Sequence, residues 1–188
     1  MNAFQRYRVL LQRYVNPNAI PVLYRNWTDK SRKYHGIAHL EDVLAYIERW
    51  SYRFNKEEFE SLILAAFFHD AVYGVKDAED QSILFFKMAY IGEGINTKLV
   101  DEAIECTKHR KKPTKVSLKV FWEADNQIFK KSWRDYLLWE SGIKFEYSHV
   151  ADDIYIKKRI EFLNENLGKF GPRADSYLNK LINQIGDK

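Results

Sequence analysis

The run Leu62-Ile63-Leu64-Ala65-Ala66-Phe67-Phe68, followed by His69-Asp70, is the stretch on which the fold and function of this chain depend. Its first seven residues are apolar, which predicts a buried segment within a helix over about residues 56–72. The run ends in an adjacent imidazole and carboxylate, and such groups are costly to bury without a partner. The sequence therefore raises the question of what His69 and Asp70 bind.

Helical spacing of apolar residues also dominates the rest of the chain, with no strand alternation and no internal repeat. We therefore expect an all-α fold, a helical bundle that forms a single domain over residues 1–188. Asp77 is expected to cap the helix that begins near Glu79. The predicted helices cover about residues 2–14, 22–27, 39–53, 56–72, 79–91, 97–109, 117–130, 133–141, 152–166 and 172–185.

Two further polar residues fall on apolar helix faces. His39 begins a stripe that continues with Val43 and Ile47, so its side chain is expected to face the core. Asp125 shares a face with large apolar residues and needs a partner. Its neighbours on that stripe are Leu118, Phe121, Trp122, Ile128 and Phe129.

A shared metal ion would explain the four buried polar side chains together. His39, His69, Asp70 and Asp125 offer two imidazole nitrogens and two carboxylates, which suit a divalent ion such as Mn, Fe, Co, Ni or Zn, with Mg as a further option. Local hydrogen bonds could satisfy any one of them alone. A metal ion held in this way would acidify its water and polarise a phosphoryl group.

The composition limits the alternatives. The 188 residues are 46% hydrophobic, which indicates a globular protein, and the net charge of +4 suits an anionic substrate without requiring nucleic acid. Cys106 is the single cysteine, so an internal disulfide is excluded. The longest apolar run has seven residues, too short to span a bilayer, and no signal-peptide segment is evident. We expect a cytoplasmic protein with no membrane partner.

The order His…His-Asp…Asp resembles the HD-domain superfamily of metal-dependent phosphohydrolases, and the likeness covers most of the chain. Residues 32–40, RKYHGIAHL, resemble the RxYHxxxHI segment of a subgroup of small predicted phosphohydrolases, and residues 67–73, FFHDAVY, resemble its FHDxVY segment. Weaker likenesses involve Glu79 with Ser82 (NExxSA), Thr107 with His109 (a Thr followed by His), Glu123-Ala124-Asp125 (DxD), residues 143–150 (IRxEYxxV) and Arg159.

This resemblance implies a role for each residue that matches a motif of the family. His39, His69, Asp70 and Asp125 would be the metal ligands, and Asp70 would also take part in catalysis. Further candidates for contacting the substrate or a second metal ion are His109, Glu79, Arg32 and Tyr73.

His35 is predicted to be the general acid. The spacing from Tyr34-His35 to His39 also resembles the YHNxxHA segment of cyclic-nucleotide phosphodiesterases, in which the first histidine protonates the leaving oxygen. The ordinary pKa of histidine suits that role near neutral pH. A loop histidine that only makes a hydrogen bond is the alternative.

The predicted function is hydrolysis of a phosphoester of a small molecule, with a nucleotide as the favoured substrate. One alternative is an HD-type di-iron oxygenase, but that chemistry needs extra histidines before the last Asp, where only His109 lies. Another is a non-catalytic module that binds a nucleotide or RNA. Its one supporting feature is the basic turn at residues 108–115, which lacks interleaved aromatic residues. Nucleic acid is therefore disfavoured as a partner, and a homo-oligomer is left open.

Overall fold

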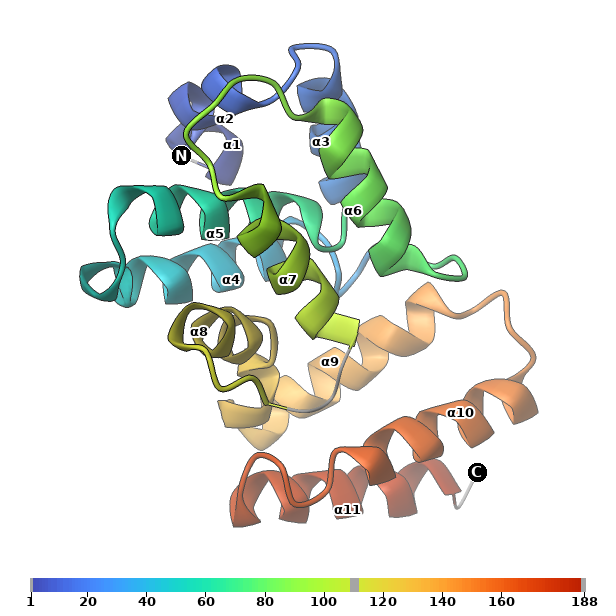
Figure 1. Cartoon of the computed structure of the whole chain (residues 1–188). Helices are drawn as coiled ribbons and strands as arrows, with labels where there is room; N and C mark the ends of the chain where they lie inside the picture. The colour runs from blue at the N-terminus through green and yellow to red at the C-terminus, as the bar shows by residue number, and fades with distance from the viewer. Residues whose placement is uncertain (1, 109–111, 187–188) are drawn as a thin grey trace. The chain divides into compact units, whose positions relative to one another are not determined.

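A computed structural model describes residues 2–108 and 112–186 (Figure 1). Within these residues the fold is all-α, as predicted, and the β-structure consists of an isolated bridge between Val15 and Tyr90. The α-helices are α1 (Ala3–Arg6), α2 (Arg8–Tyr14), α3 (Ala19–Trp27), α4 (Ile37–Arg49), α5 (Lys56–Phe68), α6 (Ala78–Ala89), α7 (Thr97–Lys108), α8 (Val116–Asp125), α9 (Trp133–Glu146), α10 (Asp152–Glu165) and α11 (Pro172–Gly186). Two 3₁₀-helices are η1 (Ser51–Arg53) and η2 (Gln127–Lys130).

The chain divides into two compact units, Met1–Asp125 and Asn126–Lys188. The first contains α1 to α8 with η1, and the second contains η2 and α9 to α11. That residues 1–188 form a single domain stays a prediction.

Helix α5 is the centre of the first unit. All its residues from Ser61 to Phe68 are buried, because α4, α6, α7 and α8 pack around it (Figure 1). A capping box starts the helix: the Asn55 side chain accepts from the Glu58 N–H, and the Glu58 side chain accepts from the Asn55 N–H. Full burial of each large apolar side chain stabilises the fold by about 1.5–3 kcal/mol. The apolar run is thus the core of this unit.

Several helix ends differ from the prediction. α5 ends at Phe68 rather than near residue 72, and the predicted helices over 39–53 and 117–130 are each an α-helix followed by a 3₁₀-helix. α9 continues to Glu146, five residues beyond its predicted end at 141. Apolar periodicity does not mark a helix end, because tertiary partners of the last carbonyls decide where the helix stops.

Asp77 is the N-cap residue of α6, but its side chain does not cap the helix as the prediction requires. Within the described residues it precedes the helix in the left-handed region, with φ of 55°, and its side chain makes no capping hydrogen bond. A residue in this conformation does not direct its side chain at the N–H groups of the first turn as an extended N-cap does.

The second unit contains a buried arginine on α10. Arg159 is 6% exposed and lies 4.2 Å over the Trp139 ring of α9. Its Nε donates to Glu140 Oε2 at 2.8 Å, and the Tyr155 hydroxyl donates to Glu140 Oε1 at 2.7 Å. These bonds join α10 to α9. In the part of the chain that is described, no helix combines the length and the hydropathy needed to cross a membrane.

Candidate metal centre

His39 lies on the first turn of α4, which begins after Gly36. Its side chain is only 5% exposed, and Val43, Tyr46 and Ile47 continue the buried face, as the sequence predicts. The imidazole therefore points into the unit rather than toward solvent, because α4 packs against α5 and α8 on this face.

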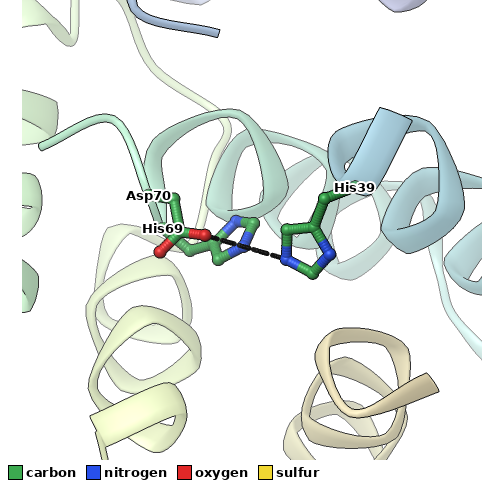
Figure 2. Close-up of side chains that lie close together, drawn as sticks. All are labelled: His39, His69 and Asp70. Atoms are coloured by element: carbon green, nitrogen blue, oxygen red, sulfur yellow. Dashed lines mark hydrogen bonds and ion pairs between the residues drawn. The ribbon is translucent and has the colours of Figure 1, made fainter. Parts of the chain in front are cut away.

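His69 and Asp70 lie at the end of α5. His69 keeps helical backbone angles but is the C-cap residue, and Asp70 begins the turn that follows. The His69 side chain is 1% exposed, whereas that of Asp70 is 18% exposed. Figure 2 shows the His69 and Asp70 side chains directed at the imidazole of His39, which comes from the other helix.

Three of the four predicted ligands form a tight group. His39, His69 and Asp70 each offer a ligand atom, and these atoms all lie within 4.8 Å of one another. The two Nε2 atoms are 3.2 Å apart, and Asp70 Oδ2 lies 3.7 Å from that of His39 and 3.3 Å from that of His69. Two ligand atoms that bind one first-row ion at about 2.1 Å, at right angles, lie about 3 Å apart. This group could hold a metal ion.

Asp125 is the last residue of α8 and approaches the same point. Its Oδ1 lies 3.2 Å from His39 Nε2 and 3.7 Å from His69 Nε2. Among the described residues it does not belong to the mutually close group of three. Opposite ligands of one ion are farther apart than adjacent ones, so a fourth ligand need not lie close to all three of the others. Asp125 is thus placed to complete the set from a third helix.

A hydrogen bond to the backbone orients the imidazole of His69. Its Nδ1 lies 2.8 Å from the carbonyl oxygen of Ala66, and since that oxygen only accepts, Nδ1 must carry the proton. In the neutral ring, Nε2 then has a lone pair directed at His39. Such a second hydrogen bond to a backbone carbonyl is the usual way in which a metal-binding histidine is oriented.

The electrostatics of the group favour a positive charge. Burial disfavours the protonated form of His69, but the carboxylates of Asp70 and Asp125 outweigh it and raise the pKa to about 9. Burial likewise disfavours ionised Asp70, yet His69, His35 and His39 hold the pKa of that carboxyl well below its ordinary value. Two carboxylates beside two imidazoles attract a cation, which is what a metal site requires.

Aromatic rings pack beside these residues. The His35 ring stacks on Tyr73, with centroids 4.2 Å apart, and meets the Tyr34 ring edge-on at 4.8 Å. The centroid of His35 is 5.8 Å from that of His39, and His35 is partly exposed. His35 is therefore beside the candidate ligands without being one of the mutually close group.

The remaining candidates have different surroundings. Arg32 donates from Nη1 to the carbonyl oxygen of Asp70 at 2.6 Å. Glu79 is partly buried in the first turn of α6 and outside the metal-binding group found in the described residues. His109 lies outside the described residues. Cys106 is buried, and burial raises the pKa of its thiol above its ordinary value, which agrees with an inert side chain.

Sequence patterns did not identify how α8 is held against α4. The Tyr46 hydroxyl donates to Glu123 Oε2 at 2.7 Å, and Lys112 Nζ lies 2.6 Å from Glu123 Oε1. Glu123 precedes Asp125 by two residues, so these contacts fix the end of the helix that carries the fourth candidate ligand. The sequence does show Glu123 as a carboxylate in a largely apolar helix. It does not show the partner of Glu123, because Tyr46 lies 77 residues earlier in the chain.

Comparison with models of protein families, with curated proteins and with solved structures finds no match for this chain. The likeness to HD-domain proteins therefore rests on the motif residues of the chain itself.

Proposed function

We propose that this protein is a metal-dependent phosphohydrolase of the HD type that cleaves a phosphoester of a small molecule, with a nucleotide as the favoured substrate. The observation that supports it most is the convergence of His39, His69, Asp70 and Asp125 from three helices on one point. The motif series from residue 32 to residue 125 also supports it, because its order is that of the HD ligands.

The residues of the site have separate roles in this proposal. The two imidazoles and two carboxylates would hold a divalent ion, which supplies Lewis-acid chemistry by polarising a phosphoryl oxygen and acidifying water. Asp70 would use its second oxygen to take the proton lost by the attacking water. His35 would protonate the leaving oxygen, and its stacking on Tyr73 would hold the ring beside the site.

The di-iron oxygenase alternative needs a second group of ligands. Among residues 2–108 and 112–186, the cluster identified as able to hold a metal ion is His39, His69 and Asp70. No observation in these residues favours a second iron, and we rank the phosphohydrolase first.

Metal analysis together with a phosphoester panel tests the proposal. Protein loaded with Mn²⁺ or Co²⁺ should bind about one ion per chain and hydrolyse at least one member of a panel of nucleotides and small phosphoesters. Asp70→Ala should abolish both properties, whereas Asp153→Ala, at an exposed carboxylate in the first turn of α10, should preserve them.

Three results would contradict the proposal. Hydrolysis that survives Asp70→Ala would remove the metal group from the reaction. Two irons per chain with oxygen uptake would instead establish the oxygenase, and tight RNA binding without hydrolysis would establish the binding module.

A further inference from the structure

The peptide groups at the end of α5 need partners, because the last carbonyls of a helix have none within it. Some are satisfied locally: the Ala65 carbonyl accepts from the His69 N–H at 2.8 Å, and that of Phe68 accepts from the Ala71 N–H at 3.0 Å. The Ala66 carbonyl accepts from the His69 imidazole. The direction of that ring is therefore tied to the path of this segment.

Side chains from α3 satisfy two further carbonyls. Trp27 Nε1 donates to the Phe67 carbonyl at 2.8 Å, and Asn26 Nδ2 donates to that of Ala71 at 2.9 Å. Trp27 is fully buried, and its ring lies 5.4 Å from that of His69. These contacts hold both ends of the segment that carries the His-Asp pair.

Arg32 spans the middle of the same segment. Its Nη1 donates to the Asp70 carbonyl at 2.6 Å and its Nη2 to the Ala71 carbonyl at 3.4 Å, so one planar guanidinium joins two successive peptides. On the far side, the Ser82 hydroxyl accepts from the Val72 N–H at 3.0 Å. A cation is also favourable here, because the carbonyl end of a helix carries partial negative charge.

We propose that Arg32 is a positioning residue for the candidate metal centre, supported by Asn26 and Trp27. By holding the Asp70 and Ala71 carbonyls, Arg32 fixes the direction of the Asp70 carboxylate, which lies outside the helix and is not held by helical hydrogen bonds. This inference rests on the proposed function, since it takes His69 and Asp70 as metal ligands. It gives Arg32 a role through the backbone rather than through contact with substrate.

Metal binding by Arg32→Met and Arg32→Lys tests this role. Loss of an outer partner of a metal ligand weakens metal binding by about 10–100-fold, so Arg32→Met should raise the Kd for Co²⁺ by that factor. Arg32→Lys keeps the positive charge on a single donor nitrogen without the planar fork, and its Kd should be intermediate. Arg25→Met is the matched control, because Arg25 is an exposed arginine on α3. It should bind Co²⁺ as the wild type does.

Two measurements separate positioning from general stabilisation. The visible absorption spectrum of bound Co²⁺ reports ligand geometry and should change in Arg32→Met but not in Arg25→Met. In metal-free protein, hydrogen exchange at the Ala71 and Val72 amides should be faster in Arg32→Met, because their segment loses its clamp.

Each outcome has a definite meaning. A wild-type Kd and Co²⁺ spectrum in Arg32→Met would overturn the positioning role, even if the variant melted at a lower temperature. If the wild type itself bound no Co²⁺, the proposed function would fail. In that case, wild-type amide exchange in metal-free Arg32→Met would overturn the positioning role by a separate measurement. Should Arg32→Met not fold, Arg32→Lys carries the same comparison.

Discussion

Asp125→Asn is the most informative change at the candidate centre, because Asp125 approaches the two imidazoles but is not in the mutually close group of three found in the described residues. The substitution keeps the shape of the side chain and removes its negative charge. If Asp125 is the fourth ligand, the variant should bind metal much more weakly. Loss of a residue that hydrogen-bonds to a metal ligand weakens metal affinity by about 10–100-fold, so loss of a ligand itself should weaken it by about 100-fold or more.

The effect on metal-induced stability follows from this weakening. A ligand at 100 times its Kd stabilises the folded state by about 2.7 kcal/mol, whereas at a concentration equal to Kd it contributes only about 0.4 kcal/mol. For a chain of this size, about 1 kcal/mol shifts Tm by roughly 2–4 °C. The Tm increase on adding Co²⁺ should therefore fall from about 5–11 °C in the wild type to about 1 °C in Asp125→Asn.

The assay is thermal unfolding with and without Co²⁺, and each variant is compared with its own metal-free Tm. This comparison removes any change in stability that the substitution itself causes. Asp153→Asn, at the start of α10, is the control and should keep the full increase. If Co²⁺ raised the Tm of Asp125→Asn as much as that of the wild type, Asp125 would not be a ligand. If Co²⁺ did not raise the Tm of the wild type, the metal centre would be refuted.

Replacing His35 with Asn should lower kcat by about 10²–10⁴-fold with metal content unchanged, because a general acid would be lost; wild-type turnover would exclude that role. Gly36→Ala should lower the free energy of unfolding in urea by about 1–3 kcal/mol, because the new Cβ would lie 2.8 Å from a backbone oxygen. Gly186→Ala is the control, since its Cβ would meet a side-chain methyl at 3.9 Å. Equal urea midpoints for the two variants would contradict this. Tyr155→Phe should cost about 1–3 kcal/mol by removing the hydrogen bond to Glu140. Burial and this carboxylate raise the pKa of Tyr155 above its ordinary value, so its stabilisation is complete below about pH 10 and is lost as the pH rises through the folded-state pKa. Unfolding at pH 8 and pH 10.5 should show this loss in the wild type and a smaller one in the variant.

The helical fold class could be predicted from the sequence because apolar spacing is a local property. The run from Leu62 to Phe68 has no polar side, so its helix must be covered in every direction, and α5 is covered in this way. The same argument placed His39 on a buried face, since it depends only on the 3.6-residue repeat of a helix.

Helix ends could not be predicted in the same way. The structure ends α5 at Phe68, and the carbonyls of residues 67, 70 and 71 around this end accept from Trp27, Arg32 and Asn26. Those partners lie 38 to 45 residues earlier in the chain. The spacing of apolar residues does not indicate a hydrogen bond between such distant residues. The helix predicted from the sequence was therefore too long.

The sequence by itself placed His39, His69, Asp70 and Asp125 on apolar faces or at the end of an apolar run; the two imidazoles are buried as expected, whereas the side chains of Asp70 and Asp125 are 18% and 20% exposed. Only the tertiary structure decided that these residues meet, with Nε2 and carboxylate oxygens 3.2 to 3.7 Å apart. The physical reason is that burial depends on the local pattern of one helix, whereas convergence depends on how α4, α5 and α8 pack against one another.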